Sequence, residues 1–232
     1  MNLKIIYEDG SVLVLDKPAG VVVFPEGNSR GKTLIDYLVD ENPELKSVGE
    51  GPRYGVVHRL DKDTSGILLV AKKAEALIFL QKQFKNREVE KKYTTLVVGS
   101  IKEDGGNIET LIGRSPSDPR KQKAYNLGEK APQSARDAIT EYKVLERFQE
   151  YTLIEVKIKT GRKHQIRCHM TYIHHPVAGD SMYSFKDSPV PVGLNRQFLH
   201  SHYLKIKLPN GNVKEFNSEL PEDLKQILED IK

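Results

Sequence analysis

The sequence has a single cysteine and no long run of apolar residues. Because Cys168 is the only thiol, an internal disulfide and a zinc site of four cysteines within the chain are both excluded. No apolar segment approaches the roughly 20 residues that cross a bilayer. The N-terminal segment reaches Glu8 and Asp9 before any apolar stretch typical of a signal peptide. We therefore expect a cytoplasmic protein with no membrane partner.

Glycine and proline are present at ordinary frequency, 17 and 12 among 232 residues, and without a period. Collagen-like and low-complexity structures are therefore excluded. The net charge is +4, but it is unevenly spread. Residues 215–232 contain six acidic residues and two lysines, a net charge of −4, which leaves +8 for residues 1–214. A basic body permits a polyanionic partner such as a nucleic acid.

Hydrophobic periodicity predicts more strands than helices. The predicted strands cover residues 3–7, 12–15, 67–71, 93–98, 151–160 and 203–208. The predicted helices cover residues 33–40, 74–88, 163–173 and 220–231. Long loops are expected at residues 25–32, 42–52, 101–107, 114–132 and 181–193. This pattern indicates an α+β fold around a mixed, largely antiparallel sheet. Since no repeat or linker marks a boundary, we expect residues 1–232 to form a single domain.

Two patterns resemble known sites but lack a required feature. Gly31-Lys32-Thr33 resembles the end of a phosphate-binding loop, yet the position that needs the first glycine holds Glu26. We therefore interpret Thr33 as the start of a helix. The second pattern is a cluster of possible metal ligands: His164, Cys168, His169, His174 and His175. Its spacing matches no metal motif, so we expect core or hydrogen-bonding roles.

The segment His58–Gly66, of sequence HRLDKDTSG, carries the first candidate for chemistry. Its Asp, Thr, Ser and Gly residues favour a tight loop by side-chain-to-backbone hydrogen bonds. Asp61 lies between Arg59 and Lys62, and nearby cations favour an ionised carboxylate. Asp61 therefore suits a nucleophile or a charge stabiliser. The alternative is an ordinary turn in which an aspartate caps the backbone.

The segment Thr160–Arg167, TGRKHQIR, is the second candidate. A strand ends, a glycine turns and a helix begins, so backbone N–H groups together with Arg162 and Lys163 form a potential anion site. A solvated helix end is the alternative. Arg167, one turn further, lies among apolar residues and needs a carboxylate partner, for which Asp61 is a candidate. Residues 114–123, with a net charge of +3, add a basic loop suited to backbone phosphates.

Four segments together resemble the RluA family of pseudouridine synthases. They are HRLDKDTSGILLVAK at 58–72, KKYTTLVVG at 91–99, TGRKHQIRCHM at 160–170 and HPVAGDSMY at 175–183. The resemblance implies an enzyme that isomerises uridine to pseudouridine in ribosomal or transfer RNA, without a cofactor or metal. It also implies the pseudouridine synthase catalytic fold, with a largely antiparallel central sheet flanked by helices and long loops. Family-like sequence begins within the first residues, so we expect the stand-alone form without an N-terminal S4 domain. We also expect a monomer.

The same resemblance implies roles for individual residues. Asp61 matches the catalytic aspartate, and Arg167 matches the arginine paired with it. Tyr93 matches the aromatic that packs against the target uracil. Arg59 matches the residue that displaces the base, and Leu199 matches an apolar residue of the pocket. Further RNA binding is expected from the basic segments, including Arg162 and Lys163.

Two other functions are compatible with parts of the pattern. A non-catalytic RNA-binding module or RNA-folding factor would use the basic segments but would not require Asp61, Tyr93 or Arg167. A glycoside hydrolase would use Asp61 and Asp63 as paired carboxylates. Two aspartates in one tight loop beside Arg59 and Lys62 fit that chemistry poorly, because such pairs need a defined separation and one raised pKa.

Overall fold

The computed structural model describes residues 3–25 and 31–232. The chain folds into two compact units, each built from two separate segments. The first unit comprises Met1–Glu90 and Ser201–Glu219, and the second comprises Lys91–His200 and Leu220–Lys232. Whether residues 1–232 form a single domain stays a prediction. None of the helices in the described residues is long and apolar enough to span a bilayer.

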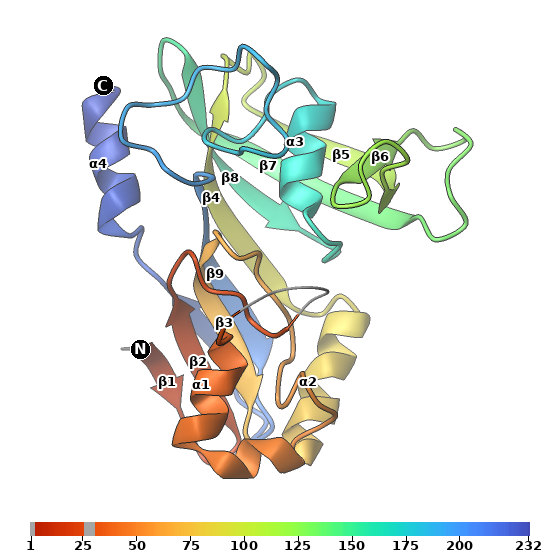
Figure 1. Ribbon diagram of the computed structural model, residues 1–232, viewed down its shortest axis with the longest axis vertical. Helices are drawn as coiled ribbons and strands as arrows, with labels where there is room; N and C mark the ends of the chain where they lie inside the picture. The colour runs from red at the N-terminus through yellow and green to blue at the C-terminus, as the bar shows by residue number, and fades with distance from the viewer. Residues whose placement is uncertain (1–2, 26–30) are drawn as a thin grey trace. The chain divides into compact units, whose positions relative to one another are not determined.

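The first unit contains the start of the chain and most of strand β9 (Figure 1). Its strands are β1 (Lys4–Glu8), β2 (Val12–Lys17), β3 (Ser65–Ala71), β9 (Leu199–Lys207, from Ser201) and β10 (Val213–Asn217). The pairs β1/β2, β2/β3 and β9/β10 are antiparallel. Its helices are α1 (Leu34–Glu41), α2 (Ala74–Lys85) and a 3-10 helix (Pro43–Ser47).

Local side-chain chemistry explains where the first elements begin. The Asp9 carboxylate accepts hydrogen bonds from the N–H groups of Ser11 and Val12, at 2.7 and 2.9 Å, and so closes the predicted hairpin turn. Thr33 and Asp36 form a reciprocal capping box that starts α1. The interpretation of Thr33 as a helix start is therefore confirmed.

The second unit is dominated by an antiparallel run of strands. These are β4 (Glu90–Val98), β5 (Gly105–Arg114), β6 (Gln122–Tyr125), β7 (Arg136–Arg147) and β8 (Tyr151–Ile158). The pairs β4/β8, β8/β7, β7/β5 and β5/β6 are all antiparallel. Helix α3 (Gln165–Tyr172) packs against β6 and β7, and α4 (Glu222–Asp230) ends the chain.

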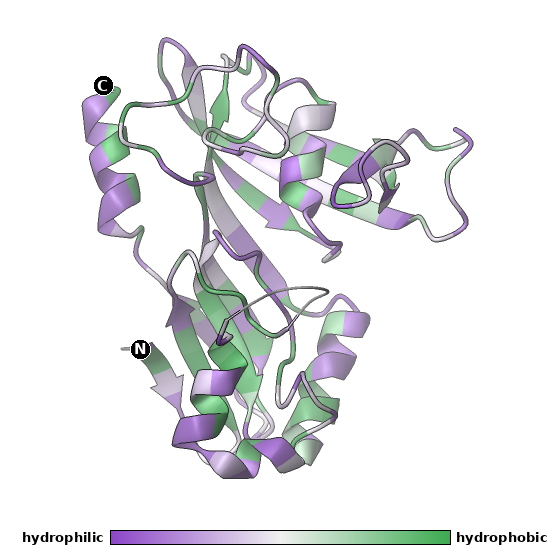
Figure 2. Cartoon of the chain, in the orientation of Figure 1, coloured by the Kyte–Doolittle hydropathy of each residue, from purple (hydrophilic) through white to green (hydrophobic). Residues whose placement is uncertain are grey.

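The acidic C-terminal helix has a packing role. Leu224 and Ile227 are buried in a cluster with Phe198, while Leu220 and Leu228 pack against its edge. Figure 2 shows apolar residues on β2 and β3 and alternating apolar and polar residues along α4. The acidic side chains of α4 occupy the face that the core does not use, as the amphipathic spacing predicts.

The described residues contain ten strands and four α-helices, which confirms the predicted α+β class. Each predicted helix and strand is present, with ends that differ by a few residues. The prediction missed β5, β6, β7 and β10. The loop expected at 114–132 is wrong in part, because it contains β6, and the loop expected at 101–107 overlaps the start of β5. The loop expected at 25–32 falls largely on residues 26–30, which lie outside the described residues.

Strand β7 was missed because its buried face is not apolar throughout. Ala138 and Thr140 are fully buried, whereas their neighbours are charged or half-exposed. Small and hydroxyl side chains give little hydropathy contrast, although they alternate correctly for a strand.

Candidate functional site

The HRLDKDTSG segment lies in the first unit and leads directly into β3. The His58 Nε2 atom accepts a hydrogen bond from the Leu69 N–H of β3 at 3.1 Å. The His58 ring stacks on Phe84 of α2, with ring centroids 4.9 Å apart. Because Nε2 is an acceptor, a neutral ring carries its proton on Nδ1. His58 therefore fastens the start of the loop to both β3 and α2.

A buried lysine fixes the middle of this loop. Lys17, at the end of β2, is fully buried, and its ammonium donates to the carbonyl oxygens of Pro18, Val21 and Lys62 at 2.8, 2.9 and 3.0 Å. An ammonium has three donors, and these three carbonyls satisfy all of them. The backbone at Lys62, next to Asp61, is thereby tied to the end of β2.

The end of the loop depends on a glycine. Gly66 has φ of +112°, and a methyl group there would lie 2.2 Å from the carbonyl oxygen of Ser201 in β9. A side chain at this position is excluded by both conformation and space. The N–H of Thr64 donates to the carbonyl of Asp61 at 3.2 Å, and the Thr64 side chain is buried. Asp61 therefore stands, half-buried, at the start of a turn that is fixed at both ends.

Arg59 and Asp61 interact electrostatically within the first unit. The Arg59 guanidinium lies over the ring of buried Phe24, 5.4 Å from its centroid. Burial lowers the pKa of Arg59, and the nearby Asp61 carboxylate opposes that change. The structure thus brings together the predicted base-displacing arginine and the predicted catalytic aspartate.

The other predicted site residues belong to the second unit. Tyr93 is buried on β4 opposite Val156 of β8, and Leu199 is buried at the start of β9. Arg162 lies in the turn between β8 and α3, where its Nε donates to the carbonyl of Asp137 at 2.9 Å. Lys163, the next residue, is exposed.

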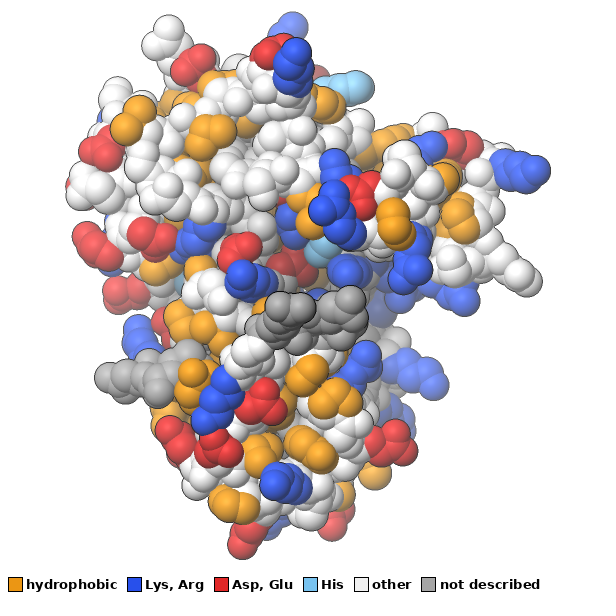
Figure 3. Space-filling model, viewed as in Figure 1, with side chains coloured by type: hydrophobic (Ala, Val, Ile, Leu, Met, Phe, Trp, Pro, Cys, Tyr) orange, Lys and Arg blue, Asp and Glu red, His pale blue; other side chains and the backbone are white. Residues whose placement is uncertain are grey.

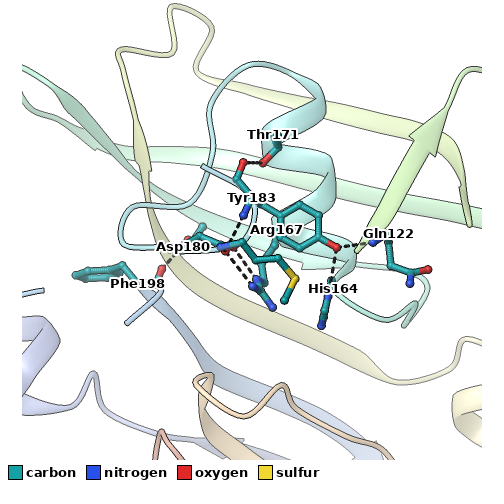
Figure 4. A network of polar contacts seen from close by, with 9 residues as sticks. Gln122, His164, Arg167, Thr171, Asp180, Tyr183 and Phe198 are labelled. Atoms are coloured by element: carbon teal, nitrogen blue, oxygen red, sulfur yellow. Dashed lines mark hydrogen bonds and ion pairs between the residues drawn. The ribbon is translucent and has the colours of Figure 1, made fainter. Parts of the chain in front are cut away.

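Arg167 has a buried carboxylate partner that the sequence analysis did not identify. Its Nε and Nη2 donate to the two carboxylate oxygens of Asp180, at 2.6 and 2.9 Å (Figure 4). The exposed fractions of the two side chains are 7% and 0%. The expectation that Arg167 needs a carboxylate is confirmed, and the partner seen in the second unit is Asp180. Pairing of Arg167 with Asp61 stays a prediction.

The Asp180 carboxylate is also held by the backbone. It accepts from the N–H groups of Met182 and Tyr183, at 2.9 and 3.0 Å. Gly179 precedes it with φ of +73°, where a methyl group would lie 2.3 Å from the Arg196 carbonyl oxygen. The Gly-Asp pair in HPVAGDSMY was the available signal for this residue, because a glycine before an aspartate is typical of a tight, side-chain-bonded turn.

Tyr183 connects α3 to β6. Its hydroxyl accepts from the N–H of Gln122 at 2.6 Å and lies 3.0 Å from His164 Nδ1 (Figure 4). Burial raises the pKa of Tyr183, so the phenol stays protonated. The Arg167 guanidinium lies 5.0 Å from the Tyr183 ring centroid. The aromatic ring and the hydroxyl together fix the N-terminal turn of α3.

Gln165 ties the first residues of α3 to β7 and to the turn before the helix. Its amide nitrogen donates to Ile139 O and Thr140 Oγ1, both at 3.0 Å. Its amide oxygen accepts from Thr160 Oγ1 at 2.7 Å and from the Arg162 N–H at 3.0 Å. The glutamine of the HQIR sequence is thus fully hydrogen-bonded inside the second unit.

His169 lies fully buried between two strand threonines. Its Nε2 and Nδ1 atoms are 2.9 and 2.8 Å from the hydroxyls of Thr110 and Thr140. Burial lowers the pKa of His169 to about 4, so the ring is neutral at neutral pH. Within the described residues, no group of three His, Cys, Asp or Glu side chains is placed to hold a metal ion.

The remaining members of the His and Cys cluster also have identified contacts. His175 Nδ1 lies 2.9 Å from the Val98 carbonyl oxygen, and His174 stacks on Phe185. Cys168 is buried, which raises the pKa of its thiol to about 12. The predicted core and hydrogen-bonding roles are confirmed for Cys168 and His175, whereas His174 is exposed and its ring packs on Phe185.

The basic segment at residues 114–123 is partly neutralised by nearby acidic side chains. Arg120 forms a two-point pair with Asp118, which lowers the pKa of that carboxyl to about 2. Lys123 pairs with Glu129 at 3.4 Å. Figure 3 shows Lys and Arg side chains gathered over α3 and the region of β5 and β6. This face of the second unit is therefore basic, although two of its cations already have acidic partners.

Comparison with known proteins places these segments in a family. Residues 11–172 match the model of the family described as RNA pseudouridylate synthase. The chain is 40% identical over 233 residues to an uncharacterized RNA pseudouridine synthase, YlyB, of Bacillus subtilis, covering 100% of this chain and 74% of that protein. It is 38% identical over 239 residues to ribosomal large subunit pseudouridine synthase D of Pseudomonas aeruginosa, covering 98% of this chain and 71% of that protein.

Solved structures agree with the sequence matches. Human RNA pseudouridylate synthase domain containing 1 superposes with a TM-score of 0.77 at 28% identity, covering 97% of this chain and 87% of that one. The predicted pseudouridine synthase fold is therefore confirmed. The chain belongs to the RNA pseudouridylate synthase family, and the predicted enzyme class, an RNA pseudouridine synthase, is confirmed with it.

Proposed function

We propose that this protein converts specific uridines of structured RNA to pseudouridine with Asp61 as the catalytic carboxylate. The observation that carries this proposal is that the backbone around Asp61 is held rigidly. It starts a turn fixed by the Lys17 ammonium and by the close approach of Gly66 to β9, with the Arg59 guanidinium beside it. A reactive group held by rigid elements needs little reorganisation when the substrate arrives.

The reaction requires an N-glycosidic bond to break, the uracil to turn, and a C–C bond to form to the same sugar. The base must first leave its stack, which is the role proposed for Arg59. Tyr93 offers a flat apolar surface on which a detached uracil stacks, with Leu199 as a further pocket residue. Asp61, as a carboxylate, attacks the ribose or the base or removes a sugar proton. Arg167, held by Asp180, supplies fixed positive charge.

We propose ribosomal RNA as the first substrate to test and transfer RNA as the second. The support for ribosomal RNA is the name of a relative, ribosomal large subunit pseudouridine synthase D, 38% identical to this chain. The basic side chains over α3 and the turn at Arg162 and Lys163 suit RNA phosphates. A cytoplasmic location and a monomeric state are further predictions, and the monomer is checked by light scattering of the purified protein.

Tritium release tests the proposal directly. Unmodified ribosomal and transfer RNA, each labelled at uracil C5, are incubated with the purified protein, because moving the glycosidic bond to C5 expels that tritium into water. We expect Asp61→Asn to release none while it keeps its fold and most of its RNA affinity. Asp63→Asn, two residues away in the same loop, is the matched control and keeps substantial activity.

The assay also distinguishes an RNA pseudouridine synthase from the competing function. A non-catalytic RNA-binding module would bind RNA and release no tritium from either pool, in the wild type as in the variant. Release that persists in Asp61→Asn would remove Asp61 from the mechanism while leaving the enzyme class intact.

A further inference from the structure

Arg53 shares an aromatic platform with Arg59 in the first unit. Its guanidinium carbon lies 4.7 Å from the centroid of the Phe24 ring, and that of Arg59 lies 5.4 Å from the same centroid. Phe24 is itself 5% exposed, so the ring is a fixed part of the core. Two guanidinium groups are therefore held beside one rigid ring.

The backbone that carries Arg53 is tied to the strand that follows the Asp61 turn. The Arg53 N–H donates a hydrogen bond to the Glu50 carbonyl oxygen at 2.9 Å. The Arg53 carbonyl oxygen accepts one from the Val56 N–H at 2.8 Å. The Ala71 N–H of β3 donates to the Gly55 carbonyl at 2.7 Å. A methyl group on Gly55 would lie 2.3 Å from the Ala71 carbonyl oxygen, so this approach requires a glycine. Arg53 is thus presented by a fixed loop rather than by a free segment.

The two arginines differ in their electrostatic surroundings. Burial lowers the pKa of Arg59, and Asp61 lies close enough to oppose that change. The Arg53 side chain is exposed, and it makes no ion pair with any of residues 3–25 and 31–232. Two cations beside one ring repel each other, and an anion between or beside them relieves that repulsion.

We propose that Arg53 is an additional RNA-binding residue, which contacts a phosphate of the substrate next to the nucleotide that Arg59 displaces. The Phe24 ring covers one face of the guanidinium and leaves its N–H edge for a two-point contact with phosphate oxygens. Arg59 is expected to leave the ring when it enters the RNA, whereas Arg53 stays as a fixed anchor beside it. This inference rests on the proposed function, because the anion is a phosphate of the RNA substrate.

The test measures RNA affinity as a function of salt. Wild type, Arg53→Gln and Arg53→Lys are titrated with unmodified large-subunit ribosomal RNA transcribed in vitro, at several KCl concentrations. Arg87→Gln is the matched control, since Arg87 is an exposed arginine of the same unit that also lacks an ion pair with residues 3–25 and 31–232. Thermal unfolding of each variant is recorded in parallel to confirm that it is folded.

Loss of one phosphate contact has a defined signature. We expect Arg53→Gln to bind RNA roughly tenfold more weakly. The salt slope, which is the slope of log binding constant against log salt concentration, should decrease in magnitude by about one. Because the contact is made equally before and during the reaction, KM rises and kcat changes little. Arg53→Lys keeps the charge and therefore the slope, but loses part of the affinity with the two-point contact. Arg87→Gln behaves as wild type.

Two outcomes overturn the inference. The first is that Arg53→Gln binds with the wild-type affinity and salt slope. The second is that Arg53→Lys loses as much slope as Arg53→Gln, which would indicate a structural role. Failure of the proposed function looks different: the wild type then binds this RNA but releases no tritium, while the effect of Arg53→Gln on binding persists. A wild type that does not bind RNA at all contradicts both.

Discussion

Arg167 and Asp180 form a two-point ion pair that is almost completely buried within the second unit. The same carboxylate holds the backbone of Met182 and Tyr183, so one aspartate fixes both the arginine and the turn that precedes Tyr183. An arginine oriented in this way keeps its remaining N–H groups in one direction, which suits a residue whose proposed role is to supply positive charge at a reacting site.

Removal of the Asp180 charge should therefore disturb stability and activity together. We expect Asp180→Asn to lower the free energy of unfolding by about 3–5 kcal/mol, because it leaves the Arg167 charge buried without a partner. Urea unfolding measures the loss. Asp118→Asn, at the exposed pair with Arg120, is the control and should change stability little. Equal effects of the two substitutions would show that the buried pair has no special role.

Replacement of Lys17 should loosen the Asp61 turn. Lys17→Met removes the ammonium that donates hydrogen bonds to the carbonyl oxygens of Pro18, Val21 and Lys62. We expect a loss of unfolding free energy on the order of 3 kcal/mol and a lower kcat at temperatures where the protein is still folded. Lys4→Met, at a lysine whose side chain is largely exposed, serves as the control. Full activity in folded Lys17→Met would contradict the positioning role.

Alanine substitutions at Gly66 and Gly20 distinguish the cost of a steric conflict from the cost of backbone strain. Both have positive φ, +112° and +84°, but a methyl group on Gly66 would meet the Ser201 carbonyl at 2.2 Å, whereas one on Gly20 meets nothing within 4 Å. Gly20→Ala should cost about 1–2 kcal/mol for the left-handed backbone alone. Gly66→Ala should cost clearly more, because β3 and β9 must move apart. Thermal unfolding of the two variants compares them, and similar melting temperatures would show that the approach of the strands adapts easily.

Acidification should destabilise the second unit through His169. Its pKa falls from 6.5 in the unfolded chain to about 4 in the fold, so the folded state favours the neutral ring. Stability from this residue is complete above pH 6.5 and declines as the pH falls toward 4, because only the unfolded chain takes up the proton in that range. The total loss is roughly 3 kcal/mol. Urea unfolding between pH 7 and 4 measures it.

The matched variant for this prediction is His169→Gln. Its amide can bond one of the two threonine hydroxyls but does not titrate. We expect a lower stability at pH 7 and a flatter decline between pH 6.5 and 4 than in the wild type. An unchanged pH slope in the variant would assign the acid sensitivity to other groups.

The sequence by itself determined the family and the local elements. Four long motifs in the right order identified an RNA pseudouridine synthase, and period-2 and period-3.6 patterns located the strands and helices that have an apolar face. These signals are local: a capping box at Thr33 and the alternation along Tyr151–Ile158 depend only on neighbouring residues. Strands such as β7, whose buried face is built from Ala and Thr, gave no such contrast.

Only the tertiary structure decided the partners of the polar motif residues. Folding brings distant chain segments together in three places. Arg167 pairs with Asp180, and Lys17 donates to the carbonyl of Lys62. Arg53 and Arg59 lie over the same Phe24 ring. A sequence shows that a buried charge needs a partner, because an unpaired one is too costly, but it does not show which of the 32 acidic residues supplies it. The need of a buried charge for a partner can be read from the neighbouring residues, whereas the packing of distant segments determines which residue is that partner.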